Sequence, residues 1–278
     1  MTASQIRLLS LIRREVNRFM KIKRQTIGGP LLETFLYISV FGAALGSRIH
    51  QVHGFKYIVF VIPGLIMMAW AMNAFANNSS SILQQKFSRS IDDQLSSPAS
   101  PLQLLMGFSL GGFIRGFIVA MLTLAVSMVL VSLPIREPLV LIPAMILVGL
   151  FFAQAGVLIG VRAEQFDDVA LYQTFMLQPL IFLGGVFYSA SLLPEPFRTL
   201  TRFNPVYYMI SLVRYGFLGY KDTSVLFSFV MLVIFTGLIT AVNYRIFVQG
   251  KYLRTERPVW VWWPGVEPGG ARSRDGGA

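Results

Sequence analysis

The chain offers few residues that could catalyse a reaction or bind a metal. Its two histidines, His50 and His53, have no carboxylate beside them, so we interpret them as loop residues rather than as a metal site. Glu164, Asp167 and Asp168 have a spacing that could ligate a cation, although a solvated or partner-facing loop explains them more simply. The sequence contains no cysteine, no H-E-x-x-H and no G-x-x-x-x-G-K-S/T phosphate loop. We therefore expect no enzyme activity, and any ATP that drives this protein must be hydrolysed by another polypeptide.

A polar segment between two long apolar runs, residues 84–101, carries the most informative pattern. Phe87, Ile91 and Leu95 recur every four positions, which predicts a short helix with three apolar side chains on one face. Ser-Ser-Pro and Ser-Pro steps then end that helix. Such a helix suits docking to a soluble partner, and the alternative is a solvated connecting loop. The charged positions of the segment are Lys86, Arg89, Asp92 and Asp93.

The composition indicates a membrane protein. Apolar residues make up 54% of the 278 residues and charged residues only 13%, which is about half the usual share of charge. Several runs reach roughly 20 residues with almost no charge, the length that a helix needs to cross a bilayer. We predict an all-α polytopic membrane protein with six transmembrane helices. Their expected positions are residues 30–48, 57–77, 103–132, 139–161, 169–188 and 224–243.

The distribution of positive charge predicts the orientation of these spans. The formal net charge is +11, which could indicate nucleic acid, but the basic residues gather at the ends of the spans. With both termini in the cytoplasm, 16 Lys and Arg residues lie on the cytoplasmic side and seven on the other. Cytoplasmic loops carry the excess of positive charge in membrane proteins. We therefore expect a multi-pass protein with cytoplasmic termini and no nucleic-acid partner, and we find no cleaved signal peptide pattern.

The chain divides into three parts. Residues 1–29 predict an amphipathic helix that lies in the membrane interface and contacts lipid headgroups, residues 30–250 form the transmembrane domain, and residues 251–278 form a cytoplasmic tail that is largely disordered. The apolar face expected for the first helix comprises Leu9, Ile12, Val16, Phe19 and Met20. Its basic face comprises Arg7, Arg14, Arg18 and Lys21.

Two features inside the spans point to packing. Gly107/Gly111 and Gly112/Gly116 are small-residue pairs at helical spacing, which allow helix backbones to approach closely within or between subunits. Arg115 is the clear intramembrane charge, and a charge at the bilayer centre costs about 2.5–3.5 kcal/mol. We expect it to face protein, water or a partner. A structural pair is favoured over a contact with substrate, and both remain open.

The segment at residues 191–219 is apolar, but prolines and arginines keep it from crossing the membrane. We interpret it as an extracytoplasmic re-entrant helical hairpin. Three parts of the sequence then resemble one family: the polar segment at 84–101, the stretch from Gly184 to Ser189 with Leu193-Pro194, and the run from Asn204-Pro205 to Gly219. Together they resemble the permease subunit of an ABC-2 type ABC transporter, over residues 5–250 or so.

The resemblance implies a cytoplasmic coupling helix at residues 84–97 and extracytoplasmic helices at 191–219. The residues expected to couple to an ATPase are Lys86, Phe87, Arg89, Ile91, Asp92, Asp93 and Leu95. The candidate pathway or gate residues are Phe187, Tyr188, Asn204, Pro205, Tyr208 and Arg214.

The function implied by the resemblance is that of an exporter subunit in the bacterial inner membrane. Two copies of the permease, most simply a homodimer, would join two ATPase subunits that bind ATP and magnesium, while this chain itself holds no cofactor. Two alternatives belong to other classes. An intramembrane enzyme would need paired carboxylates, a Ser/Lys dyad or a metal cluster within the spans, and none is visible. An ATP-independent carrier would need charges in several spans, where only Arg115 qualifies.

Overall fold

The computed structural model describes residues 3–42, 46, 48–49 and 51–250, which are mostly helical. Within these ranges, four helices are long and apolar enough to cross a membrane, and they lie where spans two, three, four and six were predicted. These helices are α3 (Tyr57–Phe87), α5 (Pro101–Leu130), α6 (Pro138–Arg162) and α11 (Val225–Gln249).

The segments predicted as spans one and five are shorter or irregular helices. The first comprises a π-helical turn, Arg24–Gly28, and α2 (Gly29–Val40). The fifth comprises α7 (Phe166–Leu171), a π-helical turn, Tyr172–Leu177, and α8 (Gln178–Leu183). In both, a proline follows the π-helical turn, Pro30 in one and Pro179 in the other. Because proline cannot donate to the carbonyl four residues earlier, a locally wider turn re-arranges the hydrogen bonds there.

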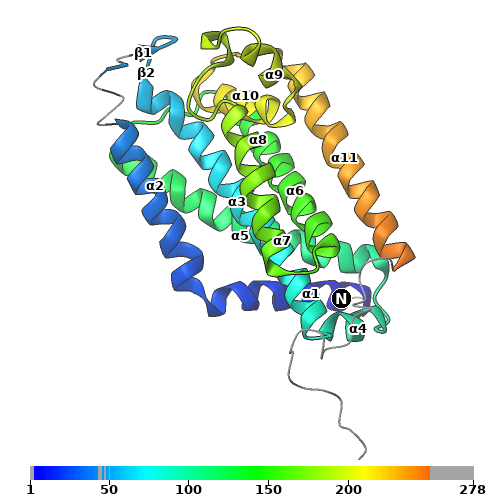
Figure 1. Cartoon of the computed structure of the whole chain (residues 1–278). Coiled ribbons are helices and arrows are strands. Elements are labelled where there is room, and N and C mark those ends of the chain that lie inside the picture. Colours follow the sequence, from blue (N-terminus) through cyan, green and yellow to red (C-terminus); the bar gives the residue numbers. More distant parts are fainter. Residues whose placement is uncertain (1–2, 43–45, 47, 50, 251–278) are drawn as a thin grey trace, which may run out of the picture.

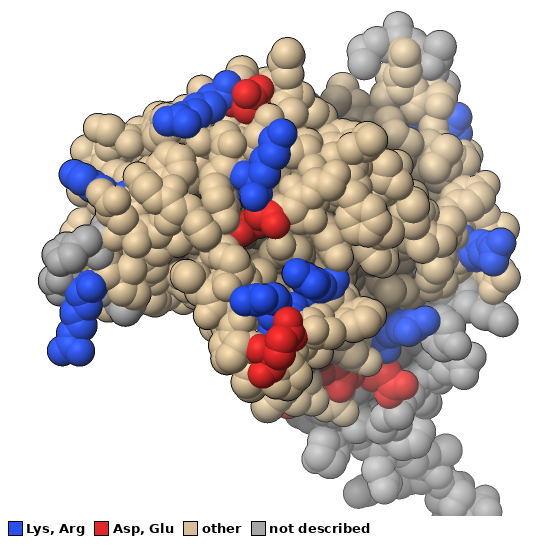
Figure 2. All heavy atoms as spheres, turned by 90° about the horizontal axis from the view of Figure 1, so that it is seen from above, with Lys and Arg blue, Asp and Glu red and all other residues tan. Residues whose placement is uncertain are grey.

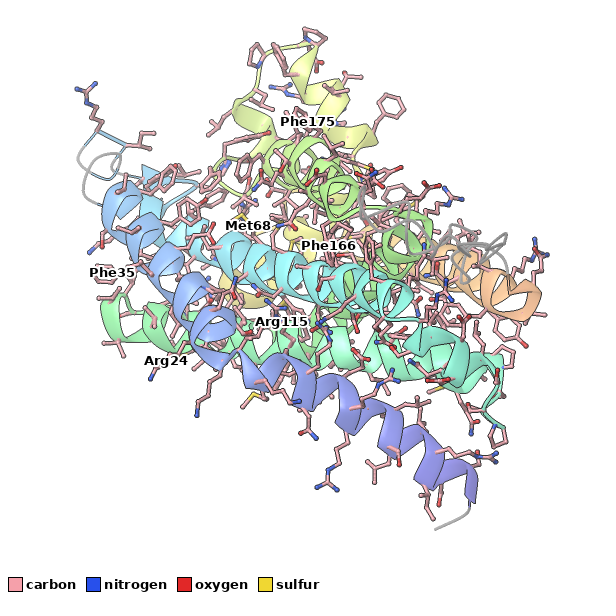
Figure 3. All side chains as sticks on the ribbon, turned by 60° about the horizontal axis from the view of Figure 1, so that its bottom comes forward. Arg24, Phe35, Met68, Arg115, Phe166 and Phe175 are labelled. Atoms are coloured by element: carbon pink, nitrogen blue, oxygen red, sulfur yellow. The ribbon has the colours of Figure 1, made fainter. Side chains whose placement is uncertain are left out.

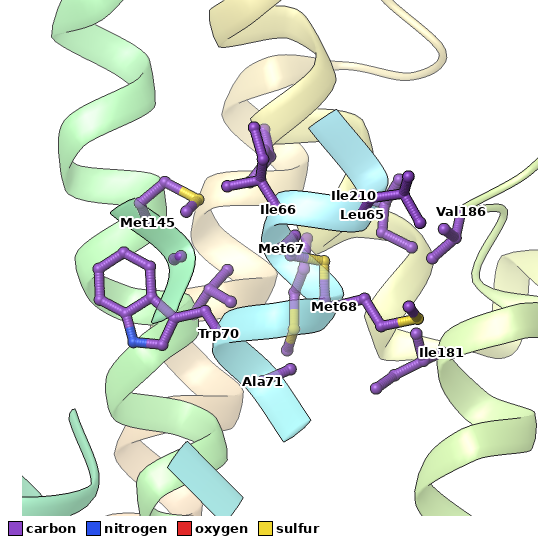
Figure 4. Packing of buried hydrophobic residues seen from close by; sticks show 14 of the residues in the cluster. Leu65, Ile66, Met67, Met68, Trp70, Ala71, Met145, Ile181, Val186 and Ile210 are labelled. Atoms are coloured by element: carbon purple, nitrogen blue, oxygen red, sulfur yellow. The ribbon is translucent and has the colours of Figure 1, made fainter. Parts of the chain in front are cut away.

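Helix α3 forms the centre of the molecule, packed mainly between α5 and α6. Its side chains point to several neighbours at once, as Figure 4 shows for Leu65, Ile66, Met67 and Met68. Glycines let these helices approach closely: a Cβ on Gly116 of α5 would collide with Trp70 of α3. The predicted small-residue pairs of α5 therefore serve packing within the subunit.

The two ends of the molecule carry different short elements (Figure 1). Helices α1 (Ala3–Lys21) and α4 (Ser90–Leu95) lie at one end, where α1 runs crosswise to the long helices. At the other end lie α9 (Phe197–Phe203), α10 (Pro205–Leu218) and the two-stranded antiparallel ribbon of β1 (Gln51–Val52) and β2 (Phe55–Lys56). Helices α9 and α10 occupy the segment predicted as a hairpin.

The turn between β1 and β2 accounts for one of the histidines. His53 and Gly54 both have positive φ, 52° and 83°, as a tight two-residue hairpin requires. The His53 ring stacks on Tyr220 at 4.4 Å, and its Nε2 lies 3.1 Å from Ser191 Oγ. His53 is therefore a turn residue, as expected from the sequence. His50 and the tail at 251–278 lie outside the described residues.

The predicted division of α1 into an apolar and a basic face is only partly right. Leu9 and Met20 are exposed, as a lipid-facing surface requires, but Phe19 is buried. Arg18 also points toward the protein, where its Nη2 donates to the backbone oxygen of Asn77 at 2.8 Å. On the face that Figure 2 shows, charged side chains are sparse and lie in small separate groups among uncharged residues.

Candidate coupling surface

The polar segment forms a helical corner rather than one continuous helix. Helix α3 extends to Phe87, Arg89 adopts the left-handed conformation with φ of 54°, and the short α4 follows. The hydroxyl oxygens of Ser88 and Ser90 lie 2.9 Å apart across the corner. Serine side chains compete with helical hydrogen bonding, which favours a break at this point. The expected single helix over residues 84–97 is therefore wrong, although the segment does lie at one end of the molecule.

Two residues expected to face a partner point into the helix bundle instead. Lys86 is 8% exposed, and its ammonium donates to the backbone oxygens of Val161 and Ala163, both at 2.8 Å. It thereby satisfies carbonyls at the end of α6, where positive charge is favourable. Ile91 is 2% exposed and belongs to a cluster with Leu104 of α5. Lys86 therefore joins the end of α3 to the end of α6, and Ile91 holds α4 against α5.

The remaining predicted residues leave a small surface for a partner. Phe87 is 37% exposed, and Arg89 and Asp93, which follow it closely in the chain, are also exposed, while Asp92 and Leu95 are half-buried. The ring of Phe87 stacks on that of Phe166, with centroids 5.3 Å apart and planes at 9°.

Phe166 opens α7 and is itself 53% exposed (Figure 3). Together Phe87, Arg89, Asp93 and Phe166 form what we call the coupling surface. One signal in the sequence pointed to Phe166, because the Phe166-Asp167-Asp168 stretch adjoins the polar loop after α6.

The acidic cluster after α6 serves the local backbone. Asp168 Oδ2 accepts from the backbone nitrogens of Glu164 and Gln165, at 2.8 and 2.9 Å. A carboxylate at this position caps the first turn of α7 and suits the positive end of a helix. Asp167 is exposed next to it. The capping role explains Asp168 without a bound cation.

A buried polar network connects the coupling surface to α1, and sequence reasoning missed it. Glu15 of α1 is 1% exposed and accepts hydrogen bonds from Ser81 at 2.6 Å and Gln85 at 3.1 Å, both on α3. Arg18 adds an ion pair to Glu15 at 3.4 Å. Gln94 of α4 in turn donates to the side-chain oxygen of Gln85. A buried carboxylate persists only with such partners, so the network ties α1, α3 and α4 into one unit.

At the opposite end, Arg214 is a structural anchor. The side chain is buried, and its Nη1 donates to Asp222 Oδ2 at 2.7 Å while its Nη2 donates to the Gly185 oxygen at 2.7 Å. The guanidinium carbon also lies 4.0 Å from the ring centroid of Phe60. Ser189 donates to the same carboxylate at 2.6 Å. These contacts join α10, α3 and the loops around them, so Arg214 does not line an open pathway in this conformation.

The other predicted gate residues mostly support backbone turns. Asn204 caps α10 by accepting from the Val206 nitrogen and donates to the Leu180 oxygen at 2.6 Å, and Pro205 is the first residue of that helix. The hydroxyls of Tyr188 and Tyr208 donate to nearby backbone oxygens.

Phe187 differs from these residues. It is half-buried and stacks on Phe41, with centroids 4.6 Å apart. It also contacts Tyr37 and Phe182, which line a cavity next to Arg115. Of the six predicted gate residues, Phe187 is the one beside that cavity.

The cavity lies between α2, α3, α5 and the helix formed by α7 and α8, and has a volume of about 260 Å³. Its polar lining comprises Glu33, Thr34, Asn73, Arg115, Gln173 and Gln178. Arg115 lines it from α5, and Figure 3 labels this side chain among the helices. The intramembrane charge predicted from the sequence is thus next to a cavity. It makes no ion pair among the described residues.

Comparison with known proteins gives one family. The family model for the ABC-2 type transporter matches residues 6–218. The chain is 40% identical over 250 residues to the inner membrane transport permease YadH of Escherichia coli (strain K12), an alignment covering 90% of this chain and 98% of that protein. It is 26% identical over 227 residues to nodulation protein J of Rhizobium leguminosarum bv. viciae, covering 78% of this chain and 84% of the relative.

Proposed function

Because the chain belongs to the ABC-2 type transporter family and is the permease subunit of an exporter, we propose that a separate ATPase subunit drives it through the coupling surface. The observation that carries this proposal is the exposed stacked pair of Phe87 and Phe166. Aromatic side chains of this kind fill pockets on a partner and dominate the energy of an interface. Arg89 and Asp93 flank the pair and orient the partner, which sets the association rate more than the affinity.

The contacts behind the coupling surface connect it to the helix bundle, so that a movement of the ATPase can be transmitted to the helices. A push on α4 reaches α3 through Gln94 and Gln85, and α1 through Glu15. A push on the end of α3 reaches α6 through Lys86, which holds the Val161 and Ala163 carbonyls. In this proposal ATP binds between two ATPase subunits, their closure moves both coupling surfaces, and the permease changes from inward- to outward-facing.

The topology belongs to the same proposal. The four long helices, α2 and the helix of α7 and α8 make six spans in a multi-pass inner-membrane protein. Both termini and α4 are cytoplasmic, and α9 and α10 form the extracytoplasmic hairpin. The excess of Lys and Arg at the end that carries α1 and α4 supports this orientation.

A second copy of the chain completes the pathway in this proposal. Phe35 of α2 is 48% exposed and Phe175 of the π-helical turn is 75% exposed, on the two helices that flank the Arg115 cavity. A polar cavity facing hydrocarbon is costly, so protein is expected to cover it. A homodimer that packs α2 and α7–α8 around a shared axis would do this.

The test is co-purification of the permease with a candidate ATPase subunit. We expect Phe87→Ala with Phe166→Ala to leave membrane insertion intact. The loss of an aromatic anchor costs about 2 kcal/mol or more, so the affinity for the ATPase should fall about 30-fold or more. Leu200→Ala with Phe203→Ala is the matched control, because these side chains are similarly apolar and exposed but lie on α9 at the other end. Equal affinities for both double variants would overturn the proposal.

A further inference from the structure

Arg115 is a half-buried charge that the coupling mechanism does not use. It lies within the apolar helix α5 and lines the cavity between α2, α3, α5 and α7–α8. A charge in a membrane span costs free energy unless protein, water or a ligand compensates it. The question is therefore which group compensates Arg115.

No protein group in the described part of the chain does so. Arg115 Nε is buried without a hydrogen-bond partner, and the side chain makes no ion pair there. Glu33 lines the same cavity but is not paired with Arg115. Glu15, the carboxylate of the neighbouring helix α1, is already paired with Arg18. Glu33 is exposed at the cavity, so among the described residues Arg115 has no counter-charge in direct contact with it.

The rest of the lining fits an amphiphile rather than a free ion. Amide and hydroxyl groups of Thr34, Asn73 and Gln178 can donate to and accept from a polar group. Met68 and Phe182 form an apolar part of the same wall. A methionine side chain adapts to irregular apolar shapes. Phe182 is 40% exposed, so this apolar part reaches the molecular surface.

We propose that this cavity binds an amphiphile carrying one phosphate or carboxylate group, and that the Arg115 guanidinium binds that group. A guanidinium matches both anions with two parallel hydrogen bonds, and burial strengthens the interaction. The apolar body of the amphiphile lies against Met68 and Phe182 and leaves the cavity between α2 and α7–α8. This amphiphile is the exported substrate, an assignment that rests on the proposed function given above.

The first experiment measures binding to the purified permease alone, in a neutral detergent, with a fluorescent alkyl phosphate as the probe. Dodecyl phosphate should displace the probe, and dodecyltrimethylammonium should not. Arg115→Gln should weaken binding of the probe about tenfold to a hundredfold, the usual loss for a charge-assisted hydrogen bond. Arg115→Lys should give an intermediate affinity, because lysine keeps the positive charge but cannot donate two parallel hydrogen bonds to the anion. Arg202→Gln, an exposed arginine of α9, should bind as the wild type does.

A second variant tests the cavity independently, in case Arg115→Gln loses binding because it misfolds. Ala69→Phe fills part of the cavity and leaves every charge in place, so it should also weaken binding. Gel filtration and co-purification of the ATPase report the fold of each variant. Equal binding by wild type and Arg115→Gln, or equal displacement by the cationic amphiphile, would overturn the proposal.

The second experiment separates an exported substrate from a lipid held for structure. The permease–ATPase complex in nanodiscs of phosphatidylcholine is given dodecyl phosphate or phosphatidylglycerol, and ATP hydrolysis is measured. Stimulation by dodecyl phosphate in the wild type, lost in Arg115→Gln, is the expected result. Binding without stimulation by either compound would contradict the assignment as substrate. Failure of the ATPase to co-purify would refute the proposed function and leave the binding result standing.

Discussion

The ion pair between Arg214 and Asp222 offers a direct test of how the extracytoplasmic end is held. We consider Asp222→Asn, which keeps the shape of the side chain and removes its charge. The side chains of Arg214 and Asp222 are both 2% exposed, and Arg214 Nη1 lies 2.7 Å from Asp222 Oδ2. Removing one member of a buried pair leaves the other charge uncompensated, at a cost of about 3–5 kcal/mol. The Gly185 oxygen still accepts from Arg214, so we expect a loss near the lower end of this range.

Unfolding by SDS in mixed micelles measures this loss as a change in the free energy of unfolding. Asp93→Asn is the matched control, because Asp93 is exposed on α4 and should change that free energy by less than about 0.5 kcal/mol. Arg214→Met with Asp222→Leu removes both charges and should be less destabilised than Asp222→Asn alone.

A free energy of unfolding for Asp222→Asn within about 0.5 kcal/mol of the wild type would refute the reasoning. It would return Arg214 to the group of candidate gate residues. In that case the charge would be expected to affect transport and leave stability unchanged.

Two further predictions concern packing and coupling. Gly116→Ala should destabilise the protein by about 1–3 kcal/mol, because the added Cβ collides with Trp70. Gly237→Ala, where nothing lies within 4 Å of the added Cβ, should be neutral or slightly stabilising. The same SDS titration compares the two variants, and equal stabilities would contradict the packing account. Glu15→Gln weakens the hydrogen bonds that this side chain accepts from Ser81 and Gln85 without changing the exposed surface. The ATPase should therefore still co-purify, while substrate-stimulated ATP hydrolysis falls. Unchanged stimulation in an ATPase assay would show that the network does not transmit the movement.

The sequence was sufficient for features that depend on composition over many residues. Long uncharged runs identified α3, α5, α6 and α11, because the cost of burying charge in a bilayer excludes charge from them. The glycine spacing in α5 likewise indicated close packing, and the structure supplies the partner helices. Prolines and arginines kept the segment of α9 and α10 from being predicted as a full span.

Features that depend on contacts between distant residues could not be read from the sequence. The period of Phe87, Ile91 and Leu95 indicated an apolar face, but it did not show that Leu104 covers Ile91 or that the helix breaks at Arg89. Glu15 sits among basic residues in the sequence, where it resembles an exposed surface charge. Its partners on α3 lie 66 and 70 residues away, so its burial follows from how α1 packs.

The absence of cysteine from the chain allows a direct test of where the ATPase binds. A single cysteine is introduced at Asp93 on α4 or at Leu192, which is 60% exposed in the segment before α9, and each is labelled with a benzophenone maleimide. Illumination of the permease–ATPase complex should give a crosslinked permease–ATPase product from the label at position 93 and none from the label at position 192. A crosslink from position 192, or none from position 93 in an intact complex, would contradict the assignment of the coupling surface.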